Sequence, residues 1–176
     1  MTERAAHWNM IDKNLWYVIY TRSRQEKVLA SQLEAAGFEV YLPLINKVSK
    51  WSDRKKVVEV PLFNSYVFIK DVCEKYHFKN FKSFVTFLNY NGKPAIVKQH
   101  EIDILKTIIK NGYDIGESSQ IEVLSEGSEV MVLSGPLKGL TGKLISVSNN
   151  DWFVLNFENM GSSLQVKIAP NLLKKI

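Results

Sequence analysis

The sequence has 176 residues, of which 45% are hydrophobic and 23% charged, a composition typical of globular proteins and long enough for one medium domain or two small ones. Its longest apolar runs fall short of the roughly 18 residues that a membrane span needs, and residues 1–13 lack the apolar core of a signal peptide. The single cysteine, Cys73, excludes an internal disulfide and a Cys-rich zinc site. We therefore expect a cytoplasmic protein without membrane contact.

The net charge of +5 is unevenly distributed. Residues up to Lys110 include 18 basic and 11 acidic side chains, a balance of +7, whereas Asn111 onward has 5 basic and 7 acidic ones, a balance of −2. This asymmetry predicts two units with different partners, of which the first is the candidate for contact with nucleic acid. A solvated, lysine-rich surface is the alternative interpretation.

Residues 1–14 are expected to form a loosely held extension, and residues 15–21 a first strand with Trp16, Val18 and Tyr20 on one face. A helix should follow, because Ser23 and Glu26 have the spacing of a capping box. Its apolar stripe consists of Val28, Leu29, Leu33 and Ala36, and Gly37 is expected to end it.

Residues 38–48 predict a strand that Pro43 bends or places at an edge. The polar, basic residues 49–56 are expected to form the tip of a long hairpin leading into a central strand at residues 61–70. Alternation along that strand predicts Leu62, Tyr66 and Phe68 on one face and Phe63, Val67 and Ile69 on the other. Both faces are apolar, so the strand is either covered on both sides by its own helices or leaves the Tyr66/Phe68 face partly open for another protein.

Residues 71–81 are weakly helical in pattern, and strands are expected at 84–88 and 94–97 around the turn Asn91-Gly92. A last helix should run from about residue 99 to 109, with Ile102, Leu105, Ile108 and Ile109 facing inward. The pattern predicts an α+β domain on a mostly antiparallel sheet. Residues 111–120 have the composition of a linker.

The remaining residues predict short strands at 129–133, 141–147, 152–157 and 163–168, separated by clusters of Gly, Pro, Asn and Asp. Short strands at this spacing are typical of a small β-barrel. A helical hairpin is the alternative that five leucines would tolerate: Leu137, Leu140, Leu144, Leu155 and Leu164.

Two groups of motifs resemble the NusG family of transcription factors. Trp16-Tyr17-Val18, the segment from Pro61 to Phe68, and Gly92-Lys93-Pro94 resemble its N-terminal (NGN) domain. The second half resembles the KOW motif that follows it in that family, through Gly127, Val130, Val132, Gly135-Pro136, Gly139 and Gly142. The resemblance implies an α+β NGN-like domain with flanking helices at 15–110, a linker at 111–121 and an SH3-like KOW barrel at 122–176.

The family resemblance implies a monomeric factor that docks on the clamp helices of the RNA polymerase β′ subunit and promotes processive transcription. The aromatic residues that would bind polymerase are Tyr20, Phe63, Tyr66, Phe68 and Tyr90. Strand parity also supports Tyr20, Tyr66 and Phe68, whereas Phe63 has the opposite parity. A contact to the polymerase gate loop would fall at Glu74, Lys75 and Tyr76, although the polar triplet of RfaH is absent there. For the KOW domain, the partners considered are a ribosomal protein and a termination factor.

Upstream DNA or the non-template strand should meet basic side chains, with aromatic ones available for stacking. The candidates are Arg22, Arg24, Lys50, Trp51, Arg54, Lys55 and Lys82. Asn64-Ser65 stands where housekeeping NusG proteins usually have Pro-Gly, which favours a specialised antiterminator of the RfaH/UpxY type, acting on selected long operons such as those for polysaccharides.

Three other classes are weighed. Catalysis is not expected, since His7, His77 and His100 have no metal-ligand spacing and no nucleophile elbow or phosphate-binding glycine loop occurs, so no cofactor or metal is predicted. A KOW-type RNA- or ribosome-binding protein would need a basic face on a second half that is net acidic. A general housekeeping NusG is the third alternative.

Overall fold

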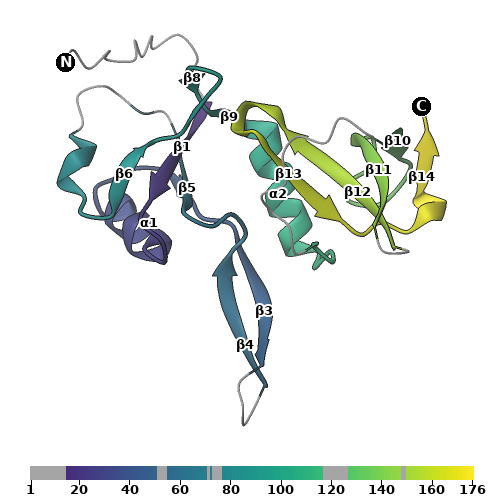
Figure 1. Ribbon diagram of the computed structural model, residues 1–176, viewed down its shortest axis with the longest axis horizontal. Coiled ribbons are helices and arrows are strands. Elements are labelled where there is room, and N and C mark those ends of the chain that lie inside the picture. The colour runs from purple at the N-terminus through teal and green to yellow at the C-terminus, as the bar shows by residue number, and fades with distance from the viewer. Residues whose placement is uncertain (1–14, 51–54, 71, 73–76, 117–126, 148–149) are drawn as a thin grey trace. The chain divides into compact units, whose positions relative to one another are not determined.

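The computed structural model describes residues 15–50, 55–70, 72, 77–116, 127–147 and 150–176 (Figure 1). Its backbone divides into two compact units, the first ending at Gln99 and the second beginning at His100. This division falls at the start of helix α2 (Gln99–Lys110). The functional domain limits at 15–110, 111–121 and 122–176 stay a prediction. No helix within the described ranges is long and apolar enough to cross a membrane.

An antiparallel sheet forms the centre of the first unit. Strand β1 (Leu15–Thr21) lies in its middle, and its branched and aromatic residues suit a strand that is paired on both sides. It pairs along one side with β5 (Tyr66–Lys70) and along the other with β6 (Phe84–Phe87) and β9 (Ile96–Lys98). The short strand β2 (Val40–Tyr41) extends the sheet beyond β5.

Helix α1 (Glu26–Ala35) covers one face of this sheet. Fully or nearly buried side chains from the helix, the sheet and a 3₁₀ turn form the core between them: Ile19, Leu29, Ala30, Leu33, Val67, Ile69 and Phe78. The helix ends as predicted at Gly37, whose φ of +88° suits glycine and whose N–H donates to the carbonyl of Glu34 at 2.9 Å. Val28, expected on the apolar stripe, is exposed instead.

The predicted capping box at the start of α1 is wrong. The N-cap position is Gln25, and no side chain caps the helix. The Glu26 carboxylate instead accepts the backbone N–H of Ser65, with 2.7 Å between the nitrogen and Oε1. A buried N–H without an acceptor costs about 1–3 kcal/mol, so this long-range bond prevails over the local one.

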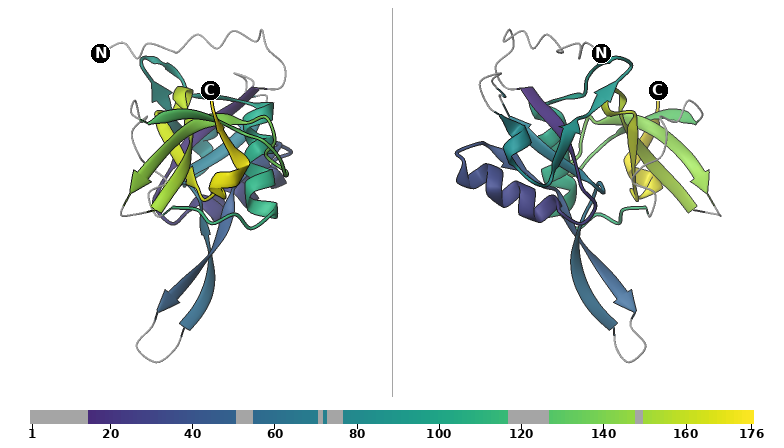
Figure 2. Two further views of the ribbon diagram at one scale, coloured as in Figure 1. Left: turned by 90° about the vertical axis from the view of Figure 1, so that its right-hand side faces the viewer. Right: turned by 60° about the vertical axis from the view of Figure 1, so that its left-hand side comes forward.

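A long hairpin leaves the sheet between β2 and β5, as predicted. Pro43 separates β2 from β3 (Leu44–Lys50), which pairs with β4 (Lys55–Pro61) over its whole length. The hairpin extends away from the sheet and α1 (Figure 2). Near its base, the Lys27 ammonium of α1 and the Glu59 carboxylate of β4 form an ion pair at 2.8 Å. Of the predicted tip at residues 49–56, residues 49–50 belong to β3 and residues 55–56 to β4, and residues 51–54 lie outside the described residues.

The strand predicted at residues 61–70 is interrupted. Pro61 is the last residue of β4, residues 62–65 form a turn, and β5 begins at Tyr66. Ser65 has a φ of +62°, a left-handed conformation that a continuous strand cannot contain. The predicted alternation therefore holds from Tyr66 to Ile69 but fails at Phe63.

Two smaller features complete the first unit. Of the weakly helical segment 71–81, the described part contains only a 3₁₀ helix, Phe78–Asn80. The predicted turn at Asn91-Gly92 is confirmed, and it joins β7 (Asn89–Tyr90) to β8 (Lys93–Pro94). Both turn residues have positive φ, +51° and +76°, as a type I′ hairpin turn requires.

The second unit contains α2 and an antiparallel sheet. In α2 the side chains of Ile102, Leu105 and Ile108 are buried as predicted, whereas Ile109 is only partly buried. The strand order is β13-β12-β11-β10-β14, with these bounds: β10 (Ser128–Val132), β11 (Thr141–Val147), β12 (Asn150–Phe157), β13 (Ser162–Val166) and β14 (Leu173–Lys175). The expected short antiparallel strands are confirmed, and β14 is an additional one. Closure into an SH3-like barrel stays a prediction.

The beginning of the expected linker is paired with this sheet. The N–H of Lys167 donates to the carbonyl of Asp114 at 2.9 Å, and the N–H of Gly116 donates to the carbonyl of Gln165 at 3.0 Å. A side chain at Gly116 would meet Gln165, because a Cβ there would lie 2.6 Å from Gln165 Oε1. Residues 114–116 thus continue the sheet at the β13 edge.

Candidate functional site

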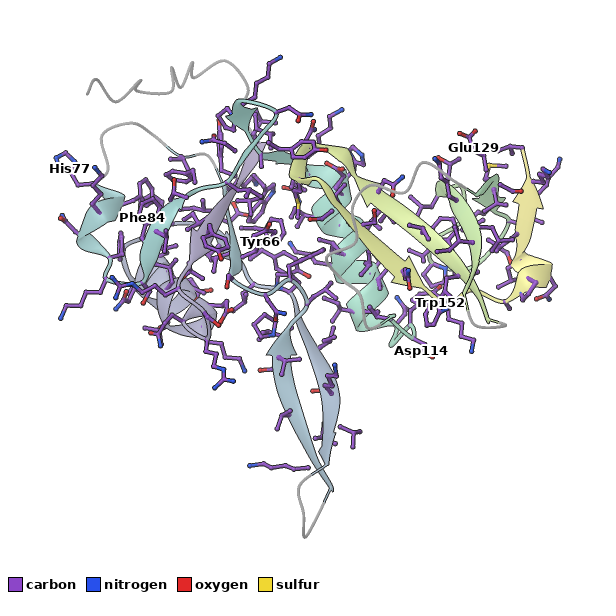
Figure 3. The ribbon with its side chains drawn as sticks, viewed as in Figure 1. Tyr66, His77, Phe84, Asp114, Glu129 and Trp152 are labelled. Atoms are coloured by element: carbon purple, nitrogen blue, oxygen red, sulfur yellow. The ribbon has the colours of Figure 1, made fainter. Side chains whose placement is uncertain are left out.

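A pair of tyrosines marks the sheet face opposite α1. Tyr20 of β1 and Tyr66 of β5 are direct cross-strand neighbours, and their rings meet edge to face with 6.1 Å between centroids. Tyr20 is 41% exposed and Tyr66 is partly buried (Figure 3). Side chains on paired antiparallel strands share a face when they are directly opposite, so both tyrosines lie on this face of the sheet.

Two buried phenylalanines lie beneath this pair. The Phe63 ring is 6.5 Å from Tyr66 in a stacked arrangement and 6.0 Å from Phe68 in an edge-on one. Both phenylalanines have no exposed surface. Phe63 thus joins the tyrosine side despite its predicted parity, because the turn at residues 62–65 redirects it. We name Tyr20, Phe63, Tyr66 and Phe68 the aromatic cluster.

Two further aromatic side chains, not selected from the sequence, extend the cluster. The Tyr41 ring lies 6.3 Å from Phe68, and the Trp16 ring lies 6.5 Å from Tyr41. Trp16 could have been selected from the sequence, because strand alternation places it on the same face as Tyr20. Tyr41 could not have been selected in this way, because its pairing opposite Phe68 depends on the bend at Pro43.

The hydroxyls of Tyr41 and Tyr66 stay protonated at neutral pH. Burial raises the pKa of Tyr41 to about 12. Burial also raises the pKa of Tyr66, and the neighbouring Tyr20 raises it further. The aromatic cluster therefore offers uncharged rings with hydrogen-bonding hydroxyls, which suits a partner surface of mixed apolar and polar character.

Tyr90 lies apart from the aromatic cluster. It is 37% exposed on the small β7–β8 hairpin, where it is paired with Lys93. Within the described part of the chain, no ring contact joins it to the four clustered residues. The structure therefore brings together four of the five predicted aromatic residues.

Three predicted basic residues lie on two adjacent turns. The N–H of Arg22 donates to the carbonyl of Ser83 at 3.1 Å, which brings the turn carrying Arg22 and Arg24 next to Lys82. All three side chains are exposed. Lys79, also exposed, is a fourth cation in the same region that the sequence analysis did not select. Lys79 could have been selected from the sequence, because it lies only three residues before Lys82.

The other predicted nucleic-acid residues belong to the hairpin end. Lys50 and Lys55 are the last described pair of the β3–β4 ribbon and stand directly opposite each other in its register. Trp51 and Arg54 lie outside the described residues, as do Glu74, Lys75 and Tyr76 of the predicted gate-loop contact. Their roles stay predictions.

Comparison with known families identifies the chain. The family described as "Transcription termination factor nusG" matches residues 14–106. The chain belongs to the NusG family of transcription factors. All the aromatic and basic residues discussed above fall within the matched range. No curated protein matches the chain significantly.

Solved structures of NusG and Spt5 resemble this chain. The structure described as "Domain interaction in Thermotoga maritima NusG" has a TM-score of 0.52 and 19% identity, covering 92% of this chain and 96% of that one. Conformations A and B of the MjSpt4:Spt5 complex have TM-scores of 0.28 and 0.27 at 18% identity, and each covers 92% of this chain and 97% or 96% of the matched one. The similarity to the Thermotoga protein supports a NusG-like fold.

The second unit, largely outside the match to the NusG family, has a shallow hollow on its sheet. Charged, polar and apolar side chains from β10, β11, β12 and the last residue line it: Glu129, Thr141, Gly142, Lys143, Val154, Leu155, Asn156 and Ile176. No group of His, Cys, Asp and Glu side chains suited to a metal ion occurs among the described residues.

Proposed function

We propose that this NusG-family protein is a transcription elongation and antitermination factor that binds the clamp helices of RNA polymerase through the aromatic cluster. One observation carries the proposal: Tyr20, which is exposed, and Tyr66, which is partly buried, pair on one sheet face, and the buried Phe63 ring packs against both Tyr66 and Phe68. The proposed activity makes and breaks no covalent bond.

The cluster has the properties of a binding anchor. Tyrosine offers a large contact area with only two rotatable side-chain bonds, so little entropy is lost when a partner immobilises it. Contact residues that dominate binding energy are typically Trp, Tyr and Arg in well-packed surroundings. Phe63 and Phe68 supply that packing, and Tyr90 would add a second contact from its hairpin.

Truncation of the paired tyrosines tests this proposal. We expect Tyr20→Ala and Tyr66→Ala each to weaken binding to core RNA polymerase by about tenfold or more, because each removes an anchoring ring. Tyr20→Phe and Tyr66→Phe are the matched controls, since they keep the ring and should retain most of the affinity. Biolayer interferometry with immobilised polymerase measures the dissociation constants.

Parental affinity in a natively folded Tyr20→Ala/Tyr66→Ala double variant would contradict the proposal. Phe68→Ala is unsuitable for this purpose, although strand alternation alone would select Phe68 as a partner of Tyr66. Phe68 has no exposed surface, and truncating a buried phenylalanine costs about 3–5 kcal/mol of stability. Its loss would not separate binding from folding.

We further propose that the basic residues contact upstream DNA or the non-template strand. Arg22, Arg24 and Lys82 are exposed on adjacent turns, and Lys79 adds a fourth charge. The hairpin end contributes Lys50, Trp51, Arg54 and Lys55, where cations can neutralise phosphates and an indole can stack on a base. The gate-loop contact at Glu74, Lys75 and Tyr76 is part of the same proposal.

Residues 122–176, the part of the second unit that follows α2 and the expected linker, are proposed to be the KOW domain, with a ribosomal protein or a termination factor as its partner. Its described strands and turns, including glycines with positive φ at Gly127, Gly135 and Gly139, support that assignment. Asn64-Ser65 supports a specialised factor of the RfaH/UpxY type, acting on selected long operons such as those for polysaccharide synthesis.

A further inference from the structure

Glu26 is a buried carboxylate that serves a distant turn. It is the first residue of α1 and is only 5% exposed. Carboxylates in the first turn of a helix commonly accept hydrogen bonds from that helix's own N–H groups. Here Oε1 of Glu26 accepts the N–H of Ser65, 39 residues away in sequence, at 2.7 Å.

Ser65 is held on both sides of its peptide backbone. Its N–H is bound by Glu26, and its carbonyl accepts the N–H of Thr21 at 2.8 Å. Thr21 is itself fixed, because its hydroxyl donates to the carbonyl of Ser83 at 2.7 Å. Ser65 needs such support, since its φ of +62° is unfavourable for any residue with a side chain.

This turn sets the position of two members of the aromatic cluster. Ser65 directly precedes Tyr66 and follows Phe63 by two residues, and the rings of Phe63 and Tyr66 stack across the turn. The other anchor of the turn, Thr21, directly follows Tyr20. Tyr20 and Tyr66 are thus each one residue from a backbone group in this hydrogen-bond network.

We propose that Glu26 is a positioning residue for the proposed polymerase-binding surface: its carboxylate fixes the 62–65 turn and thereby the Tyr66 ring against Tyr20. This inference rests on the proposed function of the aromatic cluster. Loss of the carboxylate leaves the Ser65 N–H buried without an acceptor and removes a bond to a charged group, which is stronger than a neutral one. The turn then relaxes, and Tyr66 no longer holds the geometry that the partner recognises.

Three full-length variants test the assignment. Glu26→Ala removes the acceptor, Glu26→Gln keeps an acceptor oxygen without the charge, and Ala30→Gly weakens the same helix at a buried core position whose side chain has no hydrogen-bonding group. For each variant we measure the dissociation constant for core polymerase, the hydrogen exchange of the Ser65 amide, the chemical shifts of the Tyr66 ring, and the thermal midpoint.

We expect Glu26→Ala to weaken polymerase binding about tenfold, to accelerate exchange of the Ser65 amide and to shift the Tyr66 ring resonances. Glu26→Gln should restore binding to within about threefold of the parent. Ala30→Gly should lower the thermal midpoint while leaving binding and the Tyr66 resonances unchanged. If Glu26→Ala does not fold, Glu26→Asp, which withdraws the carboxylate by one methylene, takes its place with the same expectations.

The inference is overturned if Glu26→Ala, or Glu26→Asp in its place, binds no more weakly than Ala30→Gly. It is also overturned if Glu26→Gln binds as weakly as Glu26→Ala, or as Glu26→Asp where that variant replaces it. Tyr66→Ala in the same assay separates this failure from failure of the proposed function. Parental binding by Tyr66→Ala would remove the polymerase surface and this inference with it. Weak binding by Tyr66→Ala beside parental binding by Glu26→Ala would remove the positioning role alone.

Discussion

At the scale of single residues, Ser65 occupies a backbone conformation that normally belongs to glycine. A φ of +62° brings Cβ close to the following carbonyl oxygen, at a cost of roughly 1–2 kcal/mol for a residue other than glycine. Tertiary hydrogen bonds from Thr21 and to Glu26 hold it there. The surrounding fold, and not the sequence of the turn, therefore determines this conformation.

Substitutions at Ser65 should report this strain directly. We expect Ser65→Gly to raise the free energy of unfolding by about 0.5–1 kcal/mol, because relief of strain exceeds the added freedom of the unfolded chain. Ser65→Val should lower it by about 2 kcal/mol, since β-branched residues tolerate positive φ least. Urea denaturation followed by circular dichroism measures both, and a destabilised Ser65→Gly variant would show that the hydroxyl outweighs the strain.

Phe63 shows why part of the site could not be predicted from alternation. The prediction required an unbroken strand from Pro61 onward, and apolar residues at every position allowed it. The interruption depends on hydrogen bonds from Ser65 to residues about 40 positions away, which no local pattern contains. Tyr20 and Tyr66, by contrast, were predictable because both lie inside regular paired strands.

At the scale of secondary structure, the same distinction separates correct from wrong predictions. The end of α1 at Gly37 and the turn at Asn91-Gly92 follow from the φ that each residue allows, and both were confirmed. The capping box at Ser23 and Glu26 was wrong because a buried donor from another element competed for the carboxylate. Predictions from local sequence succeed here where the backbone conformation of the residue itself decides the outcome. They fail where a residue distant in sequence supplies the hydrogen bond.

The β3–β4 hairpin is the element with the clearest electrostatic prediction. Lys50→Gln, Arg54→Gln and Lys55→Gln together should weaken DNA binding and reduce the slope of log K against log salt by up to about 3, since each phosphate contact contributes roughly 0.9. Fluorescence anisotropy with a forked DNA at several salt concentrations measures the slope. The matched control neutralises three exposed lysines of the second unit, Lys138, Lys174 and Lys175. A triple hairpin variant with the parental slope would remove the hairpin from the DNA-binding surface.

At the scale of the whole molecule, the part of the chain with excess positive charge is also the part that matches the NusG family. The residues up to Lys110 have a balance of +7, and the match to the NusG family covers residues 14–106. The later residues have a balance of −2, and their described strands form a short-stranded antiparallel sheet. This arrangement suits a factor whose first unit meets polymerase and DNA while the second meets a protein.

A specialised factor should affect few transcripts. We expect deletion of its gene to reduce RNA from the distal parts of a small number of long operons and to leave most transcription units unchanged, because selective recruitment limits where the factor acts. Strand-specific transcript profiling of deletion and complemented strains measures this. A mild effect spread over most long transcripts would instead indicate a general elongation factor.

The ion pair between Lys27 and Glu59 affects how phosphate contacts should be counted. Both side chains are about half exposed, so added salt screens their attraction just as it screens the attraction between lysines and DNA. The pair joins the base of the hairpin to α1, and its weakening would loosen the arm that carries the proposed DNA-binding charges. A salt titration of the parent protein would then overstate the number of counterions released. A Lys27→Gln background, in which that attachment is already absent at every ionic strength, supplies the corrected baseline.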